Sequence, residues 1–290
     1  MMRSYKEVAE GLGLEKYVPL GQVLFKKPRK NVELKVELFE NETGANVSQK
    51  MQKSIHALWE EHKLNNPNDF DGDVGSIISI FESPSRTWNI EFHKGRFSHF
   101  VATAAIRKRR LNVKSFPLDE ETCLPISFGA VAITKDNYII FALRGQTTFD
   151  AESVTLLPGG YFNPETDYFF VKGPSGRLEK NYSIAVTVLR ELFEETGIAL
   201  TCLKVDYLGL IYNKKGSRQP LLVCRINLPF TMGEIISRMP KHLDEESKQI
   251  FFVENDIEEV KKFLFYLHII KYDIAIHDTY KLILHFLIGY

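Results

Sequence analysis

Three carboxylates stand close together near the middle of the chain, in the run Arg-Glu-Leu-Phe-Glu-Glu-Thr-Gly-Ile at residues 190–198. Glu191, Glu194 and Glu195 occupy positions i, i+3 and i+4, so on a helix they share one face. Like charges at this spacing repel each other by roughly a few tenths of a kcal/mol per pair. A Mg²⁺ ion would offset this repulsion, because it prefers oxygen ligands and is commonly held by carboxylates together with substrate phosphates.

The same run also fits an ordinary solvated helix face, on which Arg190 pairs with the acids and Gly197 ends the helix. An upstream segment favours the metal interpretation. Residues 154–157 are apolar and strand-like, and Pro158-Gly159-Gly160 stops them. Paired glycines let the backbone approach a ligand closely, and the carbonyl of Gly160 could itself bind a metal.

Together these residues resemble the signature box of the Nudix hydrolases. Residues 190–198 match every fixed position of its second half, Arg-Glu-aliphatic-x-Glu-Glu-x-Gly-aliphatic, and Leu-Pro-Gly-Gly at 157–160 is similar to the way the box usually begins. The stretch between Gly160 and Arg190 is 16 residues longer than the family spacing, and Tyr182 stands where the early Glu of the box is expected. In the family that Glu orients the arginine. We expect Glu179, the nearest acid, to reach Arg190 in its place.

The resemblance implies a metal-dependent hydrolase that uses Mg²⁺ or Mn²⁺. Its metal ligands would be Gly160, Glu191, Glu194 and Glu195, and its catalytic residues Glu195, Glu194 and Arg190, with Glu195 serving partly as a base. Contacts to the substrate are expected from Arg144 and from an acidic loop that carries Glu245 and Glu246, where a general base sometimes lies in the family. The alternatives are a plain charge on an edge strand for Arg144 and an exposed acidic loop for the two glutamates.

The elements that must position these residues follow from the pattern of apolar residues. Runs 125–134 and 138–144, separated by Lys-Asp-Asn, predict a hairpin similar to the opening strands of a Nudix domain. We therefore expect an α/β fold, a Nudix-type α/β/α sandwich with a mixed sheet over residues 121–290, preceded by an N-terminal α+β extension over residues 1–120. Further predicted strands lie at 33–39, 77–81, 88–92, 205–212, 219–226 and 250–253, and helices at 47–64, 97–109, 232–238, 257–267 and 278–287.

The long stretch between the glycines and the box helix is rich in aromatic residues. We expect residues 161–181 to leave the Gly159-Gly160 turn, return just before the helix, and cover the substrate pocket, because both ends are fixed at the site. Ser183 would cap the helix. The aromatic side chains could stack on a base or, as we favour, fill a core.

The composition limits the kinds of partner. The 290 residues include 37 Lys and Arg and 37 Asp and Glu, and this balance argues against a nucleic-acid or membrane binder. Three well-separated cysteines predict neither a disulfide framework nor a zinc site. Residues 1–7 lack the apolar core of a signal peptide, and the longest apolar run, 263–270, is too short to span a bilayer. We expect a cytoplasmic protein with a small diphosphate substrate, and the oligomeric state is left open.

The function predicted from these features is hydrolysis of the diphosphate linkage in a nucleoside diphosphate derivative such as a nucleotide sugar. The preference for a sugar comes from the order of elements in the first 120 residues, including an Asn-Pro-x-x-Phe-Asp-Gly loop at 66–72, which is similar to a Nudix branch that hydrolyses UDP-sugars. Dinucleotides, coenzyme A and isoprenoid diphosphates are further candidates. The alternative class is a Nudix-fold binding or regulatory module without hydrolysis, which the missing early Glu favours.

Overall fold

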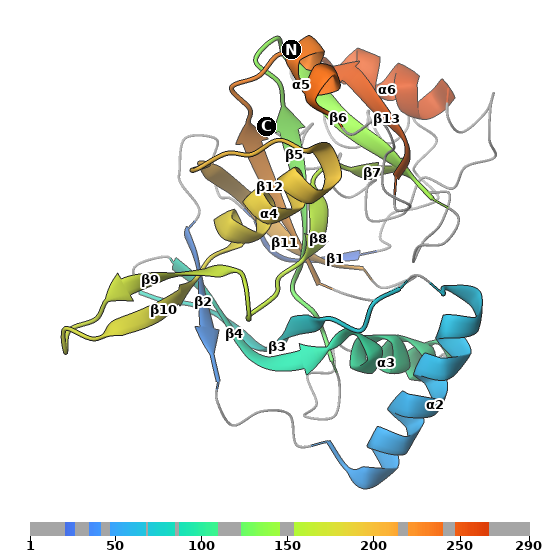
Figure 1. Cartoon of the computed structure of the whole chain (residues 1–290), viewed down its shortest axis with the longest axis vertical. Coiled ribbons are helices and arrows are strands. Elements are labelled where there is room, and N and C mark those ends of the chain that lie inside the picture. Colours follow the sequence, from blue (N-terminus) through green and yellow to red (C-terminus); the bar gives the residue numbers. More distant parts are fainter. Residues whose placement is uncertain are drawn as a thin grey trace.

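One large mixed sheet forms the centre of the protein (Figure 1). The computed structural model describes residues 21–26, 35–41, 47–67, 69–84, 87–109, 123–145, 154–213, 220–239 and 247–266. The strand order is β1-β11-β12-β5-β6-β13, with β7 paired to β6 and β8 paired to β5. Strands β12 and β5 are parallel and the other pairings are antiparallel. The strands are β1 (Gly21–Lys26), β5 (Ser127–Ile133), β6 (Tyr138–Arg144), β7 (Val154–Leu156), β8 (Gly159–Tyr161), β11 (Val205–Asn213), β12 (Pro220–Asn227) and β13 (Ser247–Glu254).

Helices cover both faces of this sheet. Successive side chains of a strand point to opposite faces. Ala130 of β5 therefore packs in one cluster with Val188 of α4 (Ile184–Thr196) and Ile235 of α5 (Met232–Arg238). Its neighbour Val131 packs in a second cluster with Val260 of α6 (Ile257–Tyr266). The predicted α/β class, mixed sheet and α/β/α layering are confirmed by these contacts.

The N-terminal part of the chain forms a smaller sheet against the same core. Its strands are β2 (Lys35–Glu40), β3 (Asp73–Glu82) and β4 (Thr87–Arg96), in the order β2-β4-β3. The same part of the chain contains helices α2 (Gln49–Asn65) and α3 (Phe97–Arg109), and α3 has the predicted bounds. Leu38, Ile90 and Phe92 of this sheet share one apolar cluster with Ala130 and α4, and β1 pairs with β11 in the large sheet. The division at residue 120 stays a prediction.

The segment between the glycines and α4 contains a hairpin that the sequence did not predict. Strands β9 (Tyr168–Lys172) and β10 (Leu178–Tyr182) pair with each other in a separate two-stranded sheet that extends away from the body (Figure 1). Phe169 is 47% exposed and Phe170 58% exposed, so the expectation that these two rings fill a core is wrong. The first part of the segment, residues 161–167, lies beside the box helix, where Tyr161 and Asp167 bond to Arg190. Its return just before α4 is as expected.

Two remaining predictions concern the ends of the chain and membranes. None of the helices in the described ranges is long and apolar enough to cross a membrane. The helix predicted at 278–287 lies outside the described residues.

Candidate active site

Helix α4 carries the three carboxylates beside its buried side, with Glu191 and Glu195 half-buried and Glu194 exposed. Ile184, Val188 and Leu192, spaced by four residues, are 1% exposed or less and anchor the helix in the core. Ser183 caps the helix as predicted, because its hydroxyl accepts from the Ala185 N–H at 3.2 Å. Gly197 ends the helix with a φ of 71°, a left-handed conformation that glycine adopts without strain.

The Gly159-Gly160 turn contacts the carboxylates of Glu191 and Glu195, although the stretch between the turn and Arg190 is 16 residues longer than the family spacing. Strand β8 pairs with β5, so that Gly160 lies opposite Phe128. A Cβ atom on Gly160 would overlap the Glu191 carboxylate, with Oε2 at 2.9 Å as the farthest of the three contacts. The Gly159 N–H donates to Glu195 Oε2 at 3.3 Å. The backbone of the turn and the acids of α4 therefore face each other, as the box resemblance implies.

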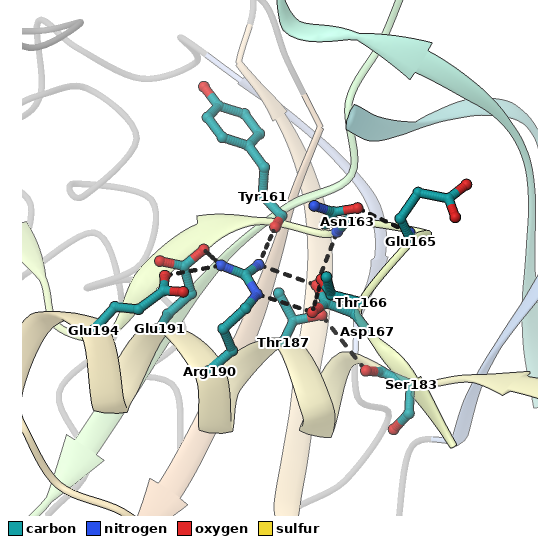
Figure 2. Close-up of polar contacts among 10 residues, drawn as sticks. All are labelled: Tyr161, Asn163, Glu165, Thr166, Asp167, Ser183, Thr187, Arg190, Glu191 and Glu194. Carbon is teal, nitrogen blue, oxygen red and sulfur yellow. Dashed lines mark hydrogen bonds and ion pairs between the residues drawn. The ribbon is translucent and has the colours of Figure 1, made fainter. Parts of the chain in front are cut away.

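Arg190 lies between two sets of carboxylates (Figure 2). Its Nη1 donates to Glu191 Oε1 at 2.9 Å and to Glu194 Oε2 at 3.0 Å. Its Nε and Nη2 donate to the two oxygens of Asp167 at 2.9 and 3.1 Å, and Nη2 also donates to the Tyr161 carbonyl at 2.9 Å. Arg190 therefore offsets the repulsion between Glu191 and Glu194, as the alternative interpretation of the helix face requires.

The partner of Arg190 is Asp167, so the expectation that Glu179 takes this place is wrong. Glu179 is exposed on β10, opposite Val171, because the hairpin carries it away from the helix. Asp167 lies at the base of the hairpin and is fully buried. The sequence held one signal for it. Asn163-Pro164-Glu165-Thr166-Asp167 is a run of turn-forming residues in which side chains bind the local backbone, as the bond from the Glu165 N–H to Asn163 Oδ1 at 2.8 Å illustrates.

Tyr182 stands at the expected position of the early Glu. Its hydroxyl and its ring contact the N-terminal sheet and not Arg190. Its hydroxyl donates to the Glu40 carboxylate on β2, and its ring packs edge-to-face on Phe92 at 5.1 Å. Burial raises the pKa of the Tyr182 hydroxyl, and the hydrogen bond to Glu40 raises it further. Tyr182 therefore stays neutral and links the hairpin to the N-terminal sheet.

The charge state of Arg190 is set by its neighbours. Burial by itself would lower the pKa of the guanidinium. The hydrogen bonds to Asp167 and the charges of Glu191, Asp167 and Glu194 outweigh that effect and raise the pKa above its ordinary value. Arg190 is therefore positively charged wherever the protein is folded.

These residues suit a divalent cation by the chemical type of their donor atoms, but their side chains are not arranged around a common point. Within the described ranges, no group of three or more His, Cys, Asp or Glu side chains is gathered so that it could hold a metal ion as it stands. Glu191 and Glu194 are both bound to Arg190, and the Glu194 side chain is 51% exposed. All the candidate donors are carboxylate or carbonyl oxygens, which suit Mg²⁺ and Mn²⁺.

Of the predicted substrate contacts, only Arg144 falls within the described residues. Arg144 is half-buried at the end of β6, across from Ser247 of β13, and its role stays a prediction. Glu245 and Glu246 fall outside the described residues.

The chain is similar in fold to several solved structures. No family model matches the chain, and no curated protein matches it in sequence. Similar solved structures include the MutT protein from Methanosarcina mazei Go1, at 18% identity over 49% of this chain and 91% of that chain with a TM-score of 0.32. A bifunctional NMN adenylyltransferase/ADP ribose pyrophosphatase from Francisella tularensis has 18% identity over 66% of this chain and 47% of that chain, with a TM-score of 0.37. A C. elegans Ap4A hydrolase has 14% identity over 57% of this chain and 99% of that chain, with a TM-score of 0.30. The resemblance to the Nudix hydrolases rests on the box residues and their contacts.

Proposed function

We propose that the chain is a Nudix-type hydrolase that cleaves the diphosphate linkage of a nucleoside diphosphate derivative with Mg²⁺ or Mn²⁺. The observation that supports this most is the meeting of the two halves of the box. Gly160 packs on the Glu191 carboxylate and the Gly159 N–H donates to Glu195, although 16 extra residues separate the halves in sequence. A chance match of nine residues would have no reason to face the glycine turn.

The chemistry of the proposal is displacement at phosphorus by water. A bound divalent cation would neutralise phosphate oxygens and lower the pKa of a water molecule. Glu191, Glu194 and Glu195 would bind it, and Arg190 would orient the first two through Nη1. Glu195 would also serve partly as the base that accepts a proton from the attacking water.

A substitution at Glu195 tests the reaction class. We expect Glu195→Gln to lower kcat by at least about 100-fold while leaving the thermal midpoint almost unchanged, since a lost metal carboxylate is not a core defect. The matched control is Glu60→Gln, the same change on the exposed side of α2. Near-normal hydrolysis by the Glu195 variant would contradict the assignment of the metal site.

The substrate within the diphosphate class is a separate part of the proposal. A nucleotide sugar is preferred because of the order of elements in the N-terminal part, with dinucleotides, coenzyme A and isoprenoid diphosphates as alternatives. A hydrolysis screen over all four groups, with Mg²⁺ and with Mn²⁺, decides between them. Turnover of a non-nucleotide diphosphate alone would reject the nucleotide preference and keep the reaction class.

The second candidate is a binding or regulatory module without hydrolysis. The observation that favours it is that Arg190 already binds Glu191 and Glu194, so these acids have a partner without a metal. Titration with Mn²⁺, followed by electron paramagnetic resonance with and without a nucleotide, separates the two candidates. If the chain is a hydrolase, we expect Mn²⁺ to bind and its affinity to fall in Glu191→Gln and in Glu195→Gln. If the chain is a binding module, we expect no Mn²⁺ binding.

A further inference from the structure

We propose that Asp167 is the positioning residue of this site and fixes Arg190, which in turn fixes Glu191 and Glu194. The inference rests on the proposed function and deepens it. The box position that would supply an acid for this purpose holds Tyr182, which binds Glu40 instead. The geometry points to an acid from the inserted segment, 23 residues before the arginine.

The guanidinium of Arg190 has a different carboxylate on each edge. An arginine side chain has five N–H donors in a rigid planar fork. All five are used here: Nε and one Nη2 donor bind Asp167, the other Nη2 donor binds the Tyr161 carbonyl, and the two Nη1 donors bind Glu191 and Glu194. Because the fork is rigid, the two-pronged bond to Asp167 sets where Nη1 points, and so sets the position of both glutamates.

Asp167 is itself held firmly. Each of its oxygens accepts two hydrogen bonds, Oδ1 from Arg190 Nε and the Thr166 hydroxyl at 3.0 Å, and Oδ2 from Arg190 Nη2 and the Asn163 N–H at 2.8 Å. Its backbone N–H donates to the Asn163 carbonyl at 2.8 Å, and its carbonyl accepts from the Ser183 N–H at 3.1 Å. A buried carboxylate with four donors has little freedom to move, which is what a positioning group requires.

The loop that carries Asp167 is also fixed to the N-terminal sheet. Phe162 is fully buried, its ring packs edge-to-face on Phe92 at 5.0 Å, and its carbonyl accepts from the Gly75 N–H at 3.0 Å. Glu165 forms an ion pair with Lys94 of β4 at 2.7 Å. The N-terminal part of the chain therefore contributes to the site indirectly, by fixing residues 162–167 beside α4.

A double-mutant cycle tests the pathway from Asp167 through Arg190. Loss of an outer carboxylate that orients a metal ligand typically costs about 10- to 100-fold in metal affinity or activity. We expect Asp167→Asn to lower kcat and Mn²⁺ affinity by about that factor, with a smaller change in KM. In an Arg190→Gln background the same substitution should cause no further loss, because its effect passes through Arg190. If the losses of the two single variants add up in the double variant, the proposal is wrong, because additive losses indicate that Asp167 and Arg190 act independently.

A direct measurement separates this proposal from the proposed function. A guanidinium N–H in a buried hydrogen bond exchanges slowly with water and gives a distinct ¹⁵N–¹H signal. The Arg190 Nε–H signal should be present in the wild-type chain and broadened or lost in Asp167→Asn. A signal that persists unchanged overturns the role of Asp167, whatever the activity. If the wild-type chain hydrolyses no diphosphate, the proposed function is wrong, and the signal still reports whether Asp167 fixes Arg190.

Two further variants guard against loss of folding. Removing one partner of a buried pair destabilises a protein strongly, whereas removing both charges together costs less, so Asp167→Asn/Arg190→Gln is the safer member of the cycle. If Asp167→Asn does not fold, Asp167→Glu keeps the charge and shifts the carboxylate by one methylene, and a reduced kcat with unchanged KM is expected. The matched control is Asp206→Asn, which breaks the 2.6 Å pair of Asp206 with Arg225 in the large sheet and should leave kcat unchanged.

Discussion

Substitution of Gly160 by alanine separates the activity of the site from the stability of the fold. A Cβ atom there would lie less than 3.0 Å from three atoms of the Glu191 carboxyl group, a separation that real Cβ atoms essentially never show. Gly160 is not among the glycines with positive φ in the described residues, so the backbone accepts alanine. The side chain of Glu191 must move instead, because it is the flexible partner.

The size of the effect follows from what Glu191 loses. Moving the carboxylate breaks its 2.9 Å bond to Arg190, which costs about 1 kcal/mol of folding stability and lowers the thermal midpoint by roughly 2 to 4 °C. A misplacement of about 1 Å at a reacting centre can cost 100-fold in rate, which corresponds to about 2.7 kcal/mol. We expect Gly160→Ala to lower kcat/KM by about 100-fold with only that small change in midpoint.

The assay is hydrolysis of the best diphosphate from the substrate screen, with the midpoint measured by circular dichroism on the same samples. The chain offers a matched control in Gly173, where a new Cβ would overlap the carboxylate of Glu179 in the same way, but on the exposed hairpin. Gly173→Ala should leave hydrolysis unchanged. Wild-type activity in a folded Gly160→Ala variant, or equal losses in both variants, would refute the reasoning.

Two further predictions concern the N-terminal sheet. Burial lowers the pKa of His93 from its ordinary 6.5, and among the described side chains its Nε2 finds no hydrogen-bond partner. As the pH falls, the unfolded chain therefore binds the proton before the folded chain does. The contribution of neutral His93 to stability is present above about pH 6.5 and is lost below it. We expect His93→Phe to reduce the decline of the thermal midpoint between about pH 7 and pH 5. Gly75→Ala would place a Cβ 2.5 Å from the buried ring of Phe162, and we expect overpacking to cost about 1 to 3 kcal/mol in denaturant unfolding. The control Gly233→Ala meets nothing within 4 Å and should not destabilise, and a Gly75 variant as stable as that control would contradict the packing argument.

The sequence by itself determined the features that depend on neighbours along the chain. The end of α4 at Gly197, the cap at Ser183 and the bounds of α3 and α5 all follow from helix period and capping chemistry, which act within four residues. The hairpin of β5 and β6 likewise follows from two apolar runs around a short turn. The acids of the box therefore had to share one face of one helix.

Only the tertiary structure decided which acid binds Arg190. Glu179 is nearer in sequence, but β9 and β10 pair with each other and carry it outward, whereas Asp167 is held at the base of the hairpin. The β9–β10 hairpin itself escaped prediction because its aromatic residues do not alternate with polar ones. The support of Phe162 by the N-terminal sheet was equally hidden, since it joins residues far apart in the chain. Periodicity carries no information about such long-range contacts, which depend on how separate elements pack together.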